Sequence, residues 1–301
     1  MGVKRLLACF LAITFCITTI PYSEYNAIIL FFVKAEEAVS EYLTYEKYDD
    51  HVEITDCDES AKGEIIIPDT IEGLPVTSIG ERAFWDCSSL TSIIIPDSVT
   101  NIGDYAFHAC TSLESITISD NVTNIGFEAF CACSLLTSII LPDSVETIGG
   151  YAFFGCSSLV SFEIPNNVTM IEDGTFRGCS SLKSVTIPNG VKNIGNYVFP
   201  ECSALTSVVI PASVEKIEYQ TFSECSNLKS ITIQNKNCDI YGSKDTISDT
   251  AVIYTTQIPP HRHTQKNITG NLLHWKNRKL ISSIADNVAM MLIIRLMKVV
   301  C

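Results

Sequence analysis

The sequence is poor in basic residues. Twenty Lys and Arg stand against thirty-four Asp and Glu, which gives the 301-residue chain a formal net charge of −14. Phosphate backbones and anionic lipid surfaces repel such a chain, so nucleic acid is not expected as a partner. Charged residues make up only 18% of the sequence and apolar residues 47%, a balance that excludes a disordered chain and predicts a folded core.

Long apolar runs are also scarce. Lys4 and Arg5 precede an uncharged, mostly apolar run at 6–20, which is typical of a secretory signal peptide. This run is short for a bilayer span, so we expect cleavage near Ala35 and no stable membrane insertion afterwards. Cleavage at Ala27 and an uncleaved anchor remain the alternatives.

What the sequence has in abundance is an internal repeat of 23 residues. Phenylalanine recurs with this spacing from Phe84 to Phe222, and leucine from Leu90 to Leu228. Cysteine recurs between them, at Cys87, Cys110, Cys133, Cys156, Cys179, Cys202 and Cys225. Such a period is the signature of a solenoid, because a unit this small buries its apolar face only by stacking on its neighbours.

The residue pattern within each unit predicts a strand, a second and shorter strand, and a helical turn. In the unit that begins at Val99, residues 113–118 alternate in polarity, which places Leu113, Ile116 and Ile118 on the inward side of a strand. Residues 99–102 predict the shorter strand, and residues 105–110 a single helical turn.

The repeat columns divide the chain into five parts. We assign residues 1–35 to the signal peptide, 36–75 to an N-terminal cap, 76–234 to seven repeats, 235–254 to a C-terminal flank and 255–301 to an atypical tail. Within the cap, residues 42–48 and 51–55 predict a β-hairpin that turns at Asp49-Asp50 and covers the first repeat.

The unit I-x-I-P-x-x-V-T-x-I-G-x-x-A-F-x-x-C-x-x-L-x-S resembles the 23-residue leucine-rich repeat of BspA-like bacterial surface proteins, from Ile65 to about Gln234. The resemblance implies a leucine-rich-repeat solenoid that is secreted or displayed at the cell surface. It also implies an adhesion or interaction role, with a protein or glycan partner whose identity the sequence does not name.

The cysteine column invites a disulfide or metal interpretation. Stacked coils hold consecutive Cys side chains parallel, however, whereas a disulfide needs converging Cβ atoms and zinc ligands usually come in close pairs. We therefore interpret the column as a structural ladder of buried free thiols.

Nothing in the sequence predicts an enzyme. A serine column runs from Ser92 to Ser230, but within the predicted repeats His108 is the one histidine and no carboxylate recurs beside it. Nucleophilic catalysis needs a base within hydrogen-bond reach, so we interpret these serines as a structural hydrogen-bonding ladder. We find no cluster of His, Asp, Glu or Cys that breaks the repeat at adjacent coils, and we expect neither a metal site nor a cofactor.

The candidate binding residues occupy a variable strand column. Its members are Ile94, Thr117, Ile140, Glu163, Thr186, Val209 and Thr232. A second variable column runs from Thr91 to Lys229, and both are predicted to point out of the open face of the sheet, where solenoids bind partners. The alternative is a plain solvated β-surface rich in threonine.

The tail departs from the pattern, because the repeat and the acidic bias both end near Thr255. Residues 258–275 can be back-translated so that another reading frame spells a peptide similar to the helical end cap of this family. We therefore interpret residues 255–301 as a frameshifted segment. An inactive, truncated or frameshifted member is the alternative to a binding protein, and a non-catalytic module associated with an enzyme is the third hypothesis.

Overall fold

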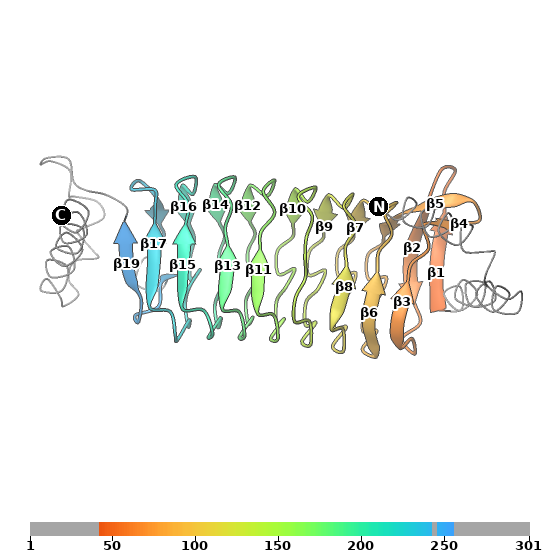
Figure 1. Cartoon of the computed structure of the whole chain (residues 1–301), viewed down its shortest axis with the longest axis horizontal. Helices are drawn as coiled ribbons and strands as arrows, with labels where there is room; N and C mark the ends of the chain where they lie inside the picture. The colour runs from red at the N-terminus through yellow and green to blue at the C-terminus, as the bar shows by residue number, and fades with distance from the viewer. Residues whose placement is uncertain (1–41, 243–245, 256–301) are drawn as a thin grey trace, which may run out of the picture. The chain divides into compact units, whose positions relative to one another are not determined.

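We analysed the fold in a computed structural model, which describes residues 42–242 and 246–255. These residues form a solenoid of stacked coils (Figure 1), so the predicted leucine-rich-repeat solenoid is confirmed. Most coils contribute one strand to each of two rows of parallel strands. The predicted signal peptide and nearly all of the atypical tail lie outside the described residues.

The first row contains the strand predicted at residues 113–118 and its counterparts in the other coils. Its strands are β3 (Gly63–Ile66), β6 (Leu90–Ile94), β8 (Ser115–Thr117), β11 (Ser161–Glu163), β13 (Ser184–Thr186), β15 (Ser207–Ile210), β17 (Ser230–Ile233) and β19 (Val252–Thr255). Pairing is parallel and follows the repeat, as in Ile93 opposite Ile116. Residues 138–140 are not assigned as a strand, and the row consists of three sheets, β3-β6-β8, β11-β13 and β15-β17-β19.

The second row contains the strand predicted at residues 99–102 and its counterparts in the other coils. Its members are β2 (Val52–Cys57), β5 (Leu74–Ile79), β7 (Asn101–Ile102), β9 (Asn124–Ile125), β10 (Thr147–Ile148), β12 (Met170–Ile171), β14 (Asn193–Ile194), β16 (Lys216–Ile217) and β18 (Asp239–Ile240). Parallel pairing continues past the seven repeats, because β18 pairs with β16 and β19 with β17. The segment that we assigned to a C-terminal flank therefore supplies one more coil.

The N-terminal cap is the predicted β-hairpin. Strand β1 (Leu43–Lys47) pairs antiparallel with β2, and the Tyr48 N–H donates to the His51 carbonyl at 2.9 Å across the turn. Strand β2 then pairs in parallel with β5, so the hairpin covers the start of the second row. A short strand, β4 (Thr70–Ile71), forms a second hairpin with β5.

The core is built from the repeat columns. The phenylalanine rings from Phe84 to Phe222 are fully buried and stack coil on coil, with neighbouring centroids 5.0–5.7 Å apart. Leu113, Ile116 and Ile118 are also buried, which confirms the predicted inward side of the strand. Stacking thus buries a continuous apolar column that no single unit encloses by itself.

The predicted helical turn is wrong. Residues 105–110 form consecutive turns, and Tyr105 and Ala109 have positive φ angles of 58° and 60°, outside the right-handed helical region. The N–H groups of Tyr105, Phe107 and Ala109 donate to carbonyls of the next coil at 2.7–2.8 Å. Because these donors are used between coils, they are not free for the hydrogen bonds of a helix.

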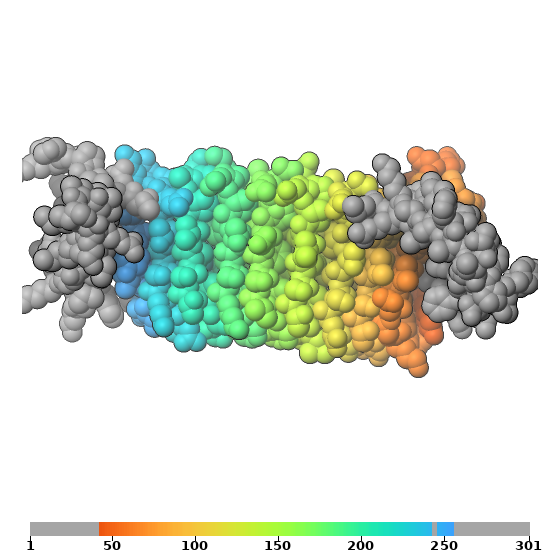
Figure 2. Space-filling model, viewed as in Figure 1, coloured from red at the N-terminus to blue at the C-terminus, as the bar shows by residue number. Residues whose placement is uncertain are grey.

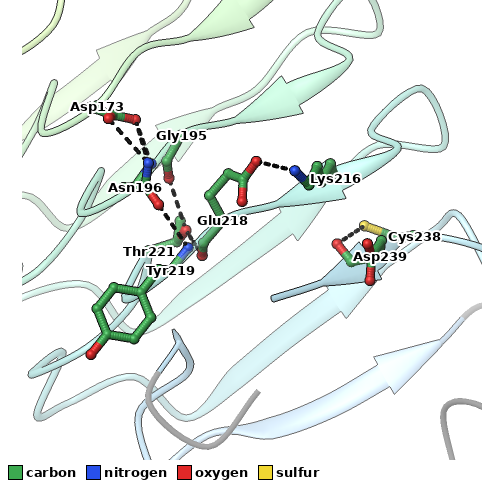
Figure 3. A network of polar contacts seen from close by, with 9 residues as sticks. All are labelled: Asp173, Gly195, Asn196, Lys216, Glu218, Tyr219, Thr221, Cys238 and Asp239. Atoms are coloured by element: carbon green, nitrogen blue, oxygen red, sulfur yellow. Dashed lines mark hydrogen bonds and ion pairs between the residues drawn. The ribbon is translucent and has the colours of Figure 1, made fainter. Parts of the chain in front are cut away.

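Polar side chains add further bonds between coils (Figure 3). Asp173, Asn196 and Tyr219 occupy the same position in three successive coils. The Asn196 N–H donates to the Asp173 carboxylate at 2.7 Å, and the Tyr219 N–H donates to the Asn196 side-chain oxygen at 3.2 Å. The Asp173 and Asn196 side chains therefore each satisfy a backbone donor of the following coil.

Candidate functional site

The outward side of the first row, which we call the strand face, contains the predicted binding column. Along β8, the buried Ile116 lies between the exposed Ser115 and Thr117, so the column points away from the core. Its members Thr117, Ile140, Glu163, Thr186 and Val209 are exposed, and Ile94 and Thr232 are half-buried. The second predicted column, from Thr91 to Lys229, is exposed in every coil.

Aliphatic side chains interrupt the polar background of the strand face. Ile140 is 85% exposed and Val209 51%, and Val160 in the second column is 40% exposed. Ile94 pairs with Ile66, which is 47% exposed, and extends the apolar surface toward the first coil.

The visible side of the described coils in Figure 2 is ridged and has no deep hollow. Such a surface suits a broad contact more than the enclosure of a small molecule.

The serine column of the strand face does not form the predicted ladder. Within the described residues, Ser92 is its one member with a side-chain hydrogen bond, to Glu64 at 3.3 Å. The reason is that these hydroxyls point outward to solvent. A serine ladder does exist one residue after the cysteines, where Ser134, Ser157, Ser180 and Ser203 each donate to a carbonyl of the preceding coil at 3.2–3.4 Å.

The cysteine ladder lies inside the coils. All seven thiols are buried and free, and those from Cys110 to Cys225 donate to a phenylalanine carbonyl of the preceding coil at 3.1–3.2 Å. Burial raises the pKa of these six thiols, and that of Cys225 reaches about 12. The thiols are therefore protonated at neutral pH and inaccessible as nucleophiles.

The turns between the two rows carry a second exposed surface, which we call the turn edge. At its N-terminal end the Trp85 indole stacks on the His108 imidazole, with centroids 4.0 Å apart and planes 9° from parallel. The Arg82 guanidinium lies over the Trp85 and Tyr105 rings, 5.5 Å and 5.1 Å from their centroids. Trp85 is nevertheless 37% exposed, and its surface is available for contact.

A cluster of metal-ligating side chains lies beside this stack and corrects our expectation that there is none. Nε2 of His108 is 3.4 Å from Oε2 of Glu128, and the ligand atoms of His108, Glu128 and Cys131 all lie within 4.8 Å of one another. Burial lowers the pKa of His108, which favours the neutral imidazole.

Sequence reasoning missed this cluster because Glu128 belongs to a different repeat column from the other two. His108 and Cys131, however, occupy the same repeat position in adjacent coils, and this spacing of 23 was the available signal. The left-handed turn at Glu128, with a φ of 50°, is part of the backbone geometry that places its carboxylate beside them.

Among residues 42–242 and 246–255, no helix has the length and hydropathy needed to cross a bilayer.

Comparison with known proteins identifies the type of repeat. A family model described as a BspA-type leucine-rich repeat region, with six copies, matches residues 63–169 and 146–261. The two matches together span most of the chain beyond the predicted signal peptide. No curated protein matches this chain.

Solved structures give a similar result. A leucine-rich cell surface protein from Faecalibacterium prausnitzii is 39% identical, with a TM-score of 0.58, over 64% of this chain and 53% of that protein. This chain therefore spans about half the length of that relative. A leucine-rich repeat protein from T. pallidum is 29% identical over 55% of this chain and 88% of its own, with a TM-score of 0.47. One from Bacteroides ovatus is 28% identical over 71% and 70%, with a TM-score of 0.41.

Proposed function

Because the chain belongs to the BspA-type leucine-rich-repeat family, we propose that it is a secreted or cell-surface module that binds a protein partner through its strand face. In this proposal the module is not an enzyme. The observation that carries it is the 85% exposure of Ile140, which lies near the middle of the strand face, between β8 and β11. Covering an exposed aliphatic side chain with a partner removes apolar surface from water, which lowers the free energy of the complex.

Two further observations support a protein over a glycan as the partner. Val209 and Ile66 are also largely exposed on the strand face, so apolar contacts are available toward both ends of the repeats. Exposed Glu114 and Lys183 lie in the neighbouring column and supply charges of both signs. Apolar anchors within a polar and charged surround are typical of protein interfaces.

The proposed location is supported by the sequence and by one relative. Residues 1–20 have the charge and apolar pattern of a secretory signal, and the similar Faecalibacterium prausnitzii protein is described as a cell surface protein. We expect the chain to be exported, and to act outside the cytoplasm.

The test compares the full chain with a triple variant, Ile94→Asp, Ile140→Asp and Val209→Asp, on arrays of extracellular matrix proteins and glycans. We expect the variant to lose binding to its protein ligand by at least 100-fold, because three charges replace the apolar anchors. A matched control, Thr169→Asp, Met170→Asp and Ala212→Asp, adds the same charge at exposed positions off the strand face. It is expected to bind like the wild type.

Both variants are expected to keep the circular dichroism spectrum of the parent. Equal binding by the strand-face variant and the parent contradicts the proposal, as does loss of binding in the control alone. Binding confined to the glycan array contradicts the choice of a protein partner.

A further inference from the structure

Three different metal-ligating side chains converge at the turn edge. His108 and Cys131 occupy the same position of two consecutive coils, and Glu128 precedes Cys131 by three residues within one turn. The Cys131 N–H donates to the Glu128 carbonyl at 3.1 Å, and the Ala109 N–H donates to the Cys131 carbonyl at 2.8 Å. These backbone bonds hold all three side chains at the junction between the coils.

We propose that His108, Glu128 and Cys131 form a zinc-binding site that joins the two coils. Imidazole nitrogen, carboxylate oxygen and thiolate sulfur are the ligand types that zinc takes in proteins, and three of them leave a fourth position for water. Protein N–O and N–S ligand pairs around a tetrahedral zinc ion lie about 3.3–3.6 Å apart, given bond lengths of about 2.0–2.3 Å. The observed His108–Glu128 separation of 3.4 Å already has this value, and the full set lies within 4.8 Å.

The surroundings of His108 suit a ligand. Nε2 is the nitrogen that faces Glu128 and would bind the ion, while Nδ1 is buried and has no hydrogen-bond partner among the described residues. Stacking against Trp85 restricts the orientation of the imidazole ring. The side chains of His108 and Glu128 are 20% and 25% exposed, which leaves a path for an ion from solvent.

Cys131 differs from the core ladder in its surroundings. The ladder thiols of Cys110 to Cys225 donate to backbone carbonyls, whereas the Cys131 thiol lies beside the Glu128 carboxylate. Cys131 is a buried free cysteine, and its thiol carries a proton that a metal ion must displace. Zinc binding therefore forms the metal–sulfur bond and releases that proton to solvent.

The site occurs once along the described repeats, because other residue types occupy the equivalent positions in the remaining coils. The position of His108 and Cys131 is filled in the other coils by Trp85, Phe154, Arg177, Pro200 and Ser223.

The experiment uses the full chain under reducing conditions, with Co²⁺ as the spectroscopic probe and Zn²⁺ as competitor. We expect one cobalt ion to produce a thiolate-to-cobalt charge-transfer band and to change the Trp85 fluorescence, and zinc to displace it. Cys131→Ser is expected to abolish the charge-transfer band. His108→Ala and Glu128→Gln are expected to weaken cobalt binding at least 10-fold, because each removes one ligand.

His51→Ala and Glu201→Gln are the matched controls, since both residues lie away from this site, and they are expected to bind cobalt like the wild type. His261 and His263 in the tail are possible ligands too. The decisive quantity is therefore the number of cobalt ions bound per chain, which is expected to be lower in His108→Ala than in His51→Ala.

Circular dichroism shows whether each variant is folded, and Glu128→Gln keeps the shape of its side chain if His108→Ala does not fold. Equal cobalt binding by the wild type and folded Glu128→Gln overturns the proposal. So does a wild-type spectrum without the charge-transfer band.

Discussion

The Cys133 thiol donates a hydrogen bond of 3.2 Å to the carbonyl oxygen of Phe107, 26 residues earlier in the chain. The same bond recurs along the cysteine ladder, for instance from Cys225 to Phe199 at 3.1 Å. A cysteine therefore serves this position in two ways, as a small apolar filler and as a weak donor to a buried carbonyl. Both roles require the reduced thiol.

The first prediction follows from this burial. Thiol reagents are expected to leave the ladder cysteines unmodified in the native protein and to modify them after denaturation, because the sulfur atoms are closed to solvent. Thr186→Cys, which adds a thiol on the exposed strand face, provides the fast-reacting control. Rapid labelling of most ladder thiols in the native state would contradict this prediction. Disulfides between neighbouring coils, detected by mass spectrometry, would also contradict it.

The second prediction concerns alkaline pH. Burial raises the pKa of Cys225 to about 12 in the folded protein, from an ordinary value of 9.0. Above pH 9 the unfolded chain loses this proton while the folded chain keeps it, so the free energy of unfolding falls as pH rises. The Cys225 thiol is expected to remove about 1.4 kcal/mol of stability at pH 10.

Urea unfolding at pH 8 and pH 10 measures this loss. Tyrosines and lysines titrate in the same range, so a comparison with Cys225→Ala isolates the contribution of the thiol. The variant is expected to be less stable than the wild type at pH 8 and to lose about 1.4 kcal/mol less on going to pH 10. An identical pH dependence in the two proteins would show that Cys225 ionises normally in the folded state.

The third prediction compares two neighbouring phenylalanines. Phe153 is fully buried and stacks between Phe130 and Phe176, with centroids 5.4 Å and 5.7 Å away, whereas Phe154 is 36% exposed. Phe153→Ala is expected to lower the free energy of unfolding by about 3–5 kcal/mol, because it removes a core ring and leaves a cavity. Phe154→Ala is expected to cost about 1 kcal/mol or less. Similar denaturation midpoints for the two variants would mean that the ring stack contributes little.

The fourth prediction uses two adjacent glycines of one turn. A Cβ atom at Gly149 would lie 2.5 Å from the Phe127 nitrogen and 2.6 Å from the Gly126 carbonyl carbon, both backbone atoms of the preceding coil. At Gly150 the nearest atom would be 3.2 Å away. Gly149→Ala is therefore expected to destabilise the protein by about 1–3 kcal/mol, because the coils must separate. Gly150→Ala is expected to cost less, and thermal unfolding that ranks the two in the opposite order would refute the argument.

The coil could be predicted from the sequence because its determinants recur. Phe, Cys and Leu return at one spacing seven times, and only stacked units bury all of them. The inward side of the strand at Leu113 and Ile116 follows from simple alternation of polarity. The cap hairpin was predictable as well, from two strand-like segments around Asp49-Asp50.

The conformation of the turn depended on tertiary structure. Residues 105–110 have the composition of a short helical turn, but the N–H groups of Tyr105 and Phe107 pair with the next coil. Pairing partners that lie one coil away in space are 22 residues away in sequence, so a local pattern does not reveal them. The orientation of the serine hydroxyls depended on the stacked coils in the same way.

The sequence by itself determined the repeat, its two strand rows and the outward column that contains Ile140 and Val209, because these depend only on the 23-residue period and on the alternation of polarity within each strand. Only the tertiary structure brought His108, Glu128 and Cys131 together. Their convergence requires both the stacking of two coils and a left-handed turn at Glu128, and neither the direction of that carboxylate nor its distance from the imidazole is encoded in the spacing of residues along the chain.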